Sequence, residues 1–312
     1  MHNFPTQSWV KLHFLFNIPR IIPYPKTDEY SLKSEDGQEV TDLGYVKVDG
    51  SWKLVLTFNT GCKIWSEDGK RLLTYLRIPE THPKFYKDPN IQNTFQGITA
   101  ARTKNEKEVI CVGNSLGEVY FFENTKESLY NNFVGFALKN EASISKLASS
   151  LKFNLVFVGD VQGFLYLYQL DTLKDVKFLK TIDLNNQNNP ITAMSVYEND
   201  NVCYLFTGDS LGKVRIYDAL TYTLSIEIAA HFRLITSIDV SVKLNRFITT
   251  SEDTFLNVWK INPDNGLALT LAKSYNSNDK MILGGKIIEK DKFNVMVTQY
   301  DCHEVSVLTS LS

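Results

Sequence analysis

Two glycine-flanked serines stand at the spacing of a catalytic motif. Residues 113–117 and 208–212 both read Gly-x-Ser-x-Gly, the spacing of the nucleophile elbow, in which a strand turns sharply into a helix and presents a serine hydroxyl for attack. Here each motif lies between two runs of strand-forming residues, and a third copy at 159–163 has Val161 in place of the serine. Because a reactive hydroxyl would not be duplicated in two copies and absent from another, we interpret all three as hairpin turns.

A Gly-Gly-Lys run at residues 284–286 contains the Gly-Lys pair of a phosphate-binding loop but not the residues that the motif requires on either side of it. That loop requires a glycine five positions before its last glycine and a Ser or Thr after the lysine. Position 280 is lysine and position 287 is isoleucine. The run therefore indicates a close backbone approach at a strand rather than a nucleotide site.

The histidines and cysteines show no spacing that would place two ligands on one metal ion. Cys302 and His303 are adjacent, so they would point to opposite faces of a strand. We expect free cysteines, no metal and no cofactor. The residues concerned are His2, His13, His82, His231, His303, Cys62, Cys111, Cys203 and Cys302.

The charge balance argues against nucleic acid as a partner. The 312 residues include 33 lysines and arginines against 35 aspartates and glutamates, a formal charge of −2, whereas nucleic-acid-binding proteins carry a basic surplus that neutralises phosphates. The longest apolar run, around residues 133–138, is far shorter than the roughly 18 residues that span a bilayer, and the first residues lack a signal-peptide pattern. We therefore expect a cytoplasmic protein without membrane insertion, whose partners are other proteins.

The turns recur at a nearly constant distance along the chain. Their second glycines, Gly117, Gly163 and Gly212, are 46 and 49 residues apart, and Thr254 holds the same place 42 residues later. A period of 40–50 residues with four short strands per repeat is typical of a β-propeller. Six copies of the central hairpin are visible, at residues 53–65, 108–122, 155–168, 203–217, 246–259 and 294–308.

We predict an all-β propeller that forms one domain over residues 1–312, although length alone would suggest two domains. The sixth copy ends near the C-terminus without a fourth strand, and the apolar run at residues 9–16 would supply it and close the ring. Residues 1–39 then give either that closing strand or a degenerate first blade. Seven blades is the preferred count and six the alternative.

The fifth copy carries the clearest signature. His231 precedes the strand-like run 234–240, Thr249 and Asp253 flank the next turn, and Trp259 lies in the run that follows. This pattern resembles a WD40 repeat. In WD40 repeats residues of these types form a hydrogen-bonded tetrad, and the resemblance implies the same structural role here. A Ser/His/Asp-type relay is the alternative, but a tetrad that pairs all its own polar groups accounts for the set more simply.

Beyond this repeat, the chain is similar to the WD repeat-containing protein 54 family. The likeness covers about residues 40–309 and is good over 96–309, whereas residues 1–39 match poorly. The resemblance implies a WD40-type propeller that acts as a non-catalytic scaffold or adaptor. The matching stretches are residues 97–101, 110–113, 251–255, 258–260, 283–285 and 300–301.

We therefore expect a protein–protein interaction scaffold, a subunit of a multiprotein hetero-complex with a cytoskeletal or ciliary setting among the options. The alternative is a propeller-based hydrolase with its site at the mouth of the channel. Binding residues tend to lie on loops, and exposed aromatic and arginine side chains are the usual anchors of an interface. On that basis the candidate partner-binding residues are Tyr24, Phe85, Tyr86 and Arg233.

Overall fold

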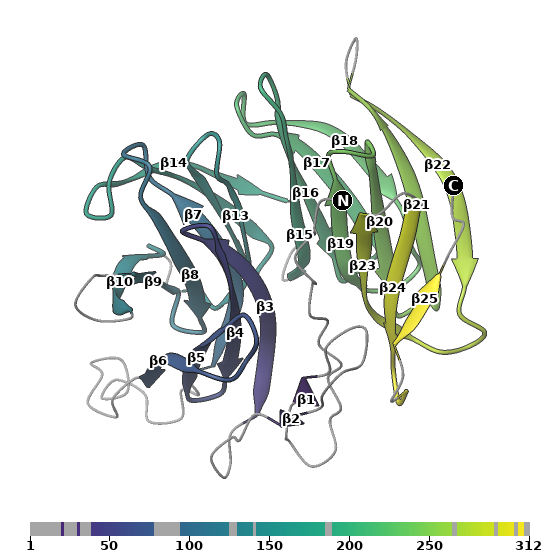
Figure 1. Cartoon of the computed structure of the whole chain (residues 1–312). Helices are drawn as coiled ribbons and strands as arrows, with labels where there is room; N and C mark the ends of the chain where they lie inside the picture. The colour runs from purple at the N-terminus through teal and green to yellow at the C-terminus, as the bar shows by residue number, and fades with distance from the viewer. Residues whose placement is uncertain are drawn as a thin grey trace, which may run out of the picture. The chain divides into compact units, whose positions relative to one another are not determined.

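The computed structural model is built from β-strands that fall into two compact units (Figure 1). Unit 1 comprises Met1–Ala100 and Glu108–Ser143, and unit 2 comprises Ala101–Lys107 and Ile144–Ser312. The expectation of a single domain stays a prediction. The structure describes residues 20–21, 30–31, 39–77, 94–124, 130–139, 142–184, 189–263, 267–289, 293–302 and 305–308.

Unit 1 contains two four-stranded antiparallel sheets and a short pair of strands, β1 (Arg20–Ile21) with β2 (Tyr30–Ser31). We call the two larger sheets blades 1 and 2. Blade 1 consists of β3 (Val40–Val48), β4 (Ser51–Phe58), β5 (Gly61–Ser66) and β6 (Leu72–Arg77). Blade 2 consists of β7 (Phe95–Arg102), β8 (Glu108–Asn114), β9 (Glu118–Glu123) and β10 (Asn131–Ala137), although the last residues of β7 are grouped with unit 2.

Unit 2 contains four sheets, blades 3 to 6, of which the first three have four strands. Blade 3 consists of β11 (Ile144–Ser150), β12 (Leu155–Asp160), β13 (Phe164–Leu170) and β14 (Val176–Asp183). Blade 4 consists of β15 (Ile191–Glu198), β16 (Cys203–Asp209), β17 (Lys213–Asp218) and β18 (Thr223–Ala229). Blade 5 consists of β19 (Ile235–Ser241), β20 (Arg246–Ser251), β21 (Phe255–Asn262) and β22 (Ala268–Asn276). Blade 6 consists of β23 (Ile282–Glu289), β24 (Phe293–Gln299) and β25 (Ser306–Leu308).

The described residues thus form six blades, which matches the alternative count of six and not the preferred count of seven. Each of the six predicted hairpins is the pair formed by the second and third strands of one blade. Blade 6 has three described strands, as the sequence indicated. The apolar run 9–16, predicted to close the ring, lies outside the described residues.

The cores of unit 2 lie in layers between neighbouring blades. Leu165 and Leu167 of blade 3 pack with Leu205 and Tyr217 of blade 4, and similar apolar layers join blade 4 to blade 5 and blade 5 to blade 6. This stacking explains why β12 and β16 are buried at every residue, whereas the fourth strand β18 is largely exposed. A central strand with both faces covered reads as a continuous apolar run and not as an alternating one.

Neighbouring blades approach so closely that one side of the contact must be a glycine. A Cβ on Gly159 would lie 2.9 Å from Ile191, and one on Gly208 would lie 2.8 Å from Ile235. Blade 5 has Thr250 at the equivalent position, and there the next blade supplies the glycine, since a Cβ on Gly285 would lie 2.8 Å from Thr250 Cγ2. The Gly-Gly-Lys run is therefore a place of close packing, as its sequence indicated.

Candidate functional site

Of the two turns that carry the catalytic-looking motifs, residues 113–117 lie in unit 1 and residues 208–212 lie at one end of the blades of unit 2. In an antiparallel sheet the second and fourth strands run in the same direction, so the turn after the second strand and the connection from the fourth strand to the next blade lie at the same end. We call this the hairpin end. It comprises residues 160–163, 209–212, 230–234, 251–254, 277–283 and 299–302.

A polar side chain closes each of four hairpin turns by accepting backbone N–H bonds. In blade 4, Asp209 Oδ1 accepts from the amides of Leu211 at 2.9 Å and Lys213 at 3.0 Å. Asn114 in blade 2 and Asp160 in blade 3 make the same pair of bonds. In blade 5, Ser251 Oγ takes the equivalent place and accepts from the Asp253 amide at 3.1 Å. These side chains mimic a backbone turn, which is why Asn, Asp and Ser recur there.

The second glycines of these turns have backbone angles that other residues adopt only with strain. Gly117, Gly163 and Gly212 have φ of 76°, 90° and 80°. Thr254 takes the equivalent position in blade 5 at φ 74°. Gly212 has a second constraint, because a Cβ there would lie 2.1 Å from the carbonyl oxygen of His231. The Gly212 carbonyl accepts bonds from the Ala230 and His231 amides, both at 3.0 Å, so this turn holds the connection that carries His231.

Both serines of the elbow-like motifs connect strand to strand and bond to neighbouring loop residues. Ser115 lies between β8 and β9, and its hydroxyl oxygen accepts from the Thr94 amide at 3.0 Å. Ser210 lies between β16 and β17, and its hydroxyl donates to Asn189 Oδ1. A nucleophile elbow requires a helix after the serine, so these two turns do not have the geometry of that motif.

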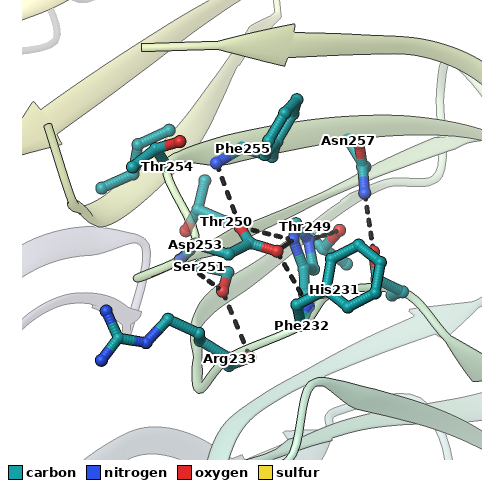
Figure 2. Close-up of polar contacts among 12 residues, drawn as sticks. His231, Phe232, Arg233, Thr249, Thr250, Ser251, Asp253, Thr254, Phe255 and Asn257 are labelled. Atoms are coloured by element: carbon teal, nitrogen blue, oxygen red, sulfur yellow. Dashed lines mark hydrogen bonds and ion pairs between the residues drawn. The ribbon is translucent and has the colours of Figure 1, made fainter. Parts of the chain in front are cut away.

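The structure brings together the four candidate tetrad residues of blade 5. Figure 2 shows three of them, His231, Thr249 and Asp253. His231 comes from the connection after β18, Thr249 from β20, Asp253 from the hairpin turn and Trp259 from β21. His231 Nδ1 lies 3.0 and 3.1 Å from the two Asp253 oxygens, and His231 Nε2 lies 2.7 Å from Thr249 Oγ1. Trp259 Nε1 donates to the same Thr249 oxygen at 3.1 Å.

Donor and acceptor roles follow from the chemistry of these groups. An indole N–H can only donate and a carboxylate only accepts. The Thr249 oxygen therefore accepts a hydrogen bond from Trp259 Nε1–H, and the Thr249 hydroxyl donates to His231 Nε2, while His231 Nδ1–H donates to Asp253. Asp253 also accepts from the amides of Phe232 at 2.9 Å and Phe255 at 3.0 Å, and thereby ties the connection to the hairpin turn. Each donor in this line from Trp259 to Asp253 has an acceptor when the imidazole is neutral.

We predict a pH dependence of stability that arises from His231. Its side chain is fully buried, and this burial lowers its pKa, an effect that Asp253 opposes in part. The unfolded chain has the ordinary histidine pKa of about 6.5, so it binds more protons than the folded chain once the pH falls below that value. The stabilisation by neutral His231 is full above about pH 6.5 and decreases as the pH falls toward the lowered folded pKa.

The measurement is urea unfolding of the wild type and His231→Gln at pH 7.5, 6.5 and 5.5. The wild type should lose free energy of unfolding more steeply than the variant as the pH falls, with a difference of at most about 1.4 kcal/mol per pH unit. Parallel pH profiles for the two proteins would contradict a buried, neutral His231.

A buried ion pair in blade 4 was not predicted from the sequence. Arg215 is 4% exposed and donates from Nη1 to the buried Asp209 Oδ2 at 2.9 Å and from Nε to Glu227 at 2.6 Å. Lys213 lies 3.0 Å from the other oxygen of Glu227. Lys213 and Arg215 hold the pKa of Glu227 below its usual range. Alternation along β17 predicts that Lys213 and Arg215 lie on one face. Their pairing with Glu227 follows only from the register of β17 and β18, which the sequence pattern does not give.

The candidate partner-binding residues fall into two groups. Tyr24, Phe85 and Tyr86 lie outside the described residues. Arg233 is exposed at the hairpin end, where its carbonyl accepts a bond from Ser251 Oγ at 3.2 Å. Its neighbour Phe232, which was not among the candidates predicted from sequence, is the most exposed large apolar side chain among the described residues, at 96%.

Neither a metal-binding cluster nor a membrane-spanning helix occurs in the described part of the chain. No group of three or more His, Cys, Asp or Glu side chains there is placed to hold a metal ion. Within the same residues no helix is long and apolar enough to cross a bilayer.

Comparison with solved structures identifies the fold. A chain from the crystal structure of a mitotic checkpoint complex matches with a TM-score of 0.70 at 12% identity, over 94% of this chain and 82% of that one. The β-propeller domain of Cps50 (Swd1) from Myceliophteria thermophila matches with a TM-score of 0.64 at 11% identity, over 86% of this chain and 83% of that one. The fold is a WD40-type β-propeller.

Sequence comparison confirms the resemblance to WD repeat-containing protein 54. The model of the WDR54 family matches residues 190–311. WD repeat domain 54 of Rattus norvegicus is 32% identical over 97 residues, which are 30% of this chain and 29% of that protein. WD repeat-containing protein 54 of Homo sapiens is 28% identical over 103 residues, which are 32% of this chain and 31% of that protein. The alignments thus span about a third of the propeller and of each relative.

Proposed function

We propose that this propeller is a non-catalytic scaffold that binds a partner protein at the hairpin end of unit 2. WD40-repeat propellers generally act in protein–protein interaction, and the proposal assigns that role to one surface of this chain. The observation that carries it is a row of exposed large apolar side chains on neighbouring turns. They are Val161 (38% exposed), Leu211 (62%), Phe232 (96%), Leu283 (49%) and Tyr300 (59%).

Backbone contacts join four of these five side chains in two pairs, Leu211 with Phe232 and Leu283 with Tyr300. The Leu211 turn approaches the connection that holds Phe232, because Gly212 and His231 are in backbone contact. The Tyr300 amide donates to the Met281 carbonyl at 2.9 Å, next to Leu283. Contiguous exposed apolar surface on a soluble protein marks an interaction site, whereas single exposed apolar residues do not. Phe232 beside Arg233 supplies the aromatic and arginine anchors typical of interface centres.

The bonding of the catalytic-looking residues supports a non-catalytic role. The hydroxyls of Ser115 and Ser210 bond to neighbouring loop residues, and Asp253 and His231 bond to each other and to the fold around them. In unit 2, the bonds of Ser210, His231 and Asp253 hold the turns that present the apolar side chains. Membership of a hetero-complex, including a cytoskeletal or ciliary one, stays a prediction.

The proposal is tested by comparing partner capture by variants of the tagged full chain. The double variant Leu211→Ser, Phe232→Ser removes the two most exposed apolar groups of the hairpin end. The control Leu72→Ser, Val134→Ser changes two exposed apolar residues of β6 and β10 in unit 1, at 41% and 46%. Quantitative mass spectrometry should show at least a tenfold loss of the stoichiometric partners in the first variant alone. Equal recovery by all three proteins would contradict the assignment.

A further inference from the structure

Thr254 takes the place of the second turn glycine in blade 5, and its backbone angle is one that a β-branched residue adopts only with strain. Its φ is 74°, whereas β-branched side chains are strongly disfavoured in the left-handed region. The equivalent position in blades 2, 3 and 4 is glycine, namely Gly117, Gly163 and Gly212. Glycine adopts positive φ without a steric penalty, so the turn itself does not require a threonine.

The interactions of Thr254 within the chain do not account for its side chain. Its carbonyl accepts from the Ser277 amide at 2.9 Å, a bond that a glycine would make equally well. Among the described residues its hydroxyl has one bond, a long one of 3.4 Å to Asn276 Oδ1 at an exposed position. The side chain is half-buried, so part of it faces solvent. Strained residues of this kind cluster at ligand-binding and other functional sites.

The turn that carries Thr254 lies between the two apolar pairs of the hairpin end. On one side, Asp253 Oδ2 accepts from the amide of Phe232, which belongs to the first pair (Figure 2). On the other side, the Thr254 carbonyl accepts from Ser277, which begins the connection to β23 and its exposed Leu283. Blade 5 therefore places the threonine side chain at the junction of the two pairs.

Threonine supplies an apolar group at this junction that glycine lacks. Its hydroxyl is engaged with Asn276 on β22, which leaves the methyl group as the part of the side chain without a bonding role in the turn. The methyl is apolar like the side chains of Phe232 and Leu283 on either side. Removal of such surface from water favours association, so a methyl here contributes to binding only when a partner covers it.

We propose that Thr254 is a specificity-determining residue of the hairpin end, where its methyl group contacts an apolar side chain of the bound partner segment. This inference rests on the function proposed above and deepens it by naming the residue that links the two apolar pairs. The strain at Thr254 lowers the stability of the free chain, and the contact made in the complex offsets it.

The test combines unfolding with peptide binding. Random 12-residue peptides displayed on phage are selected on the immobilised full chain, and those that no longer bind Leu211→Ser, Phe232→Ser are labelled with fluorescein and titrated by fluorescence anisotropy. Thr254→Gly should raise the midpoint of urea unfolding, because it relieves the strain, yet weaken these peptides at least fivefold. Thr254→Ser, which keeps only the hydroxyl, should weaken them severalfold. Thr254→Val, which keeps the methyl, should restore the affinity to within twofold of the wild type.

Glu106→Gly is the matched control for a change to glycine at positive φ. Glu106 has φ 63° in the exposed turn between β7 and β8, outside the hairpin end, and its replacement should alter the peptide affinity less than twofold. The proposal is overturned if Thr254→Gly binds as tightly as the wild type, if it unfolds at a lower urea concentration, or if serine restores the affinity and valine does not. Selection of peptides that all tolerate Leu211→Ser, Phe232→Ser would instead contradict binding at the hairpin end itself, and this inference with it.

Discussion

Gly212→Ala is expected to lower the free energy of unfolding by about 3–4 kcal/mol. Two costs combine. An L-residue at φ 80° is strained by about 1–2 kcal/mol. The added Cβ would also lie 2.1 Å from the His231 carbonyl oxygen and 2.6 Å from its carbon. Relief of that clash must move the connection that places His231 against Thr249 and Asp253.

Gly50→Ala is the matched control, because Gly50 has nearly the same backbone angle without the clash. It lies in the two-residue turn between β3 and β4 at φ 75°, and nothing lies within 4 Å of a Cβ built there. Only the conformational cost applies, about 1 kcal/mol. Urea unfolding of both variants gives the difference. Equal losses would show that the approach of the Gly212 turn to His231 has no energetic consequence.

Thr249→Val is expected to cost about 3 kcal/mol, because it leaves two buried groups without a partner. Valine has nearly the shape of threonine but neither donates nor accepts a hydrogen bond. Trp259 Nε1 would lose its acceptor, and His231 Nε2 would lose its donor. Thr249 itself is completely buried, so water cannot replace the hydroxyl without opening the blade.

Thr207→Val makes the same chemical change at a buried hydroxyl that makes only one weak hydrogen bond. Thr207 holds the equivalent position in blade 4 and is 1% exposed, but its hydroxyl makes only a long bond of 3.4 Å to the Arg215 carbonyl. We expect a change within about 1 kcal/mol of zero. The comparison is read from urea unfolding midpoints. Similar losses for the two valine variants would mean that the tetrad contributes no more than an ordinary buried threonine.

The hairpins of this fold were predictable because their turns require particular residue types. The second glycines of the turns, Gly117, Gly163 and Gly212, have positive φ angles that favour glycine. Their regular recurrence is the repeat that is visible in the sequence. Blade 1 has no such pair of glycines, since β4 and β5 are joined by the two-residue turn Asn59-Thr60. Its strands were found only from their apolar residues. The blade count was harder, because it depended on residues 1–39, where the repeat cannot be recognised.

The tetrad was predictable because all four of its residue types occur in blade 5 in the right order. The turn-closing side chains Asn114, Asp160 and Asp209 were not identified, although they recur one position after the first glycine of each turn. That recurrence was the available signal, and it is missed when only the glycines of the turns are compared.

The ion pairs and the exposed apolar row could not be derived from composition or period. Arg215 meets Glu227 only because β17 and β18 pair in one register, with a bulge between Ile216 and Tyr217 that a pattern of apolar residues does not reveal. Phe232 follows the buried His231 directly, and nothing in a chain with 19 phenylalanines distinguishes an exposed ring from a core ring. The Asp253 bond to its amide holds the backbone of the loop at this position.

Amide hydrogen exchange on the full chain, alone and in its affinity-purified complex, tests the central claim most directly. If the propeller is a scaffold that binds through the hairpin end, partner binding should slow exchange in peptides that contain residues 209–212, 230–234 and 281–283. Peptides from β6 and β10 of unit 1 should exchange at unchanged rates. Protection confined to other surfaces, or purification of the chain without a stoichiometric partner, would contradict a scaffold that binds through this end.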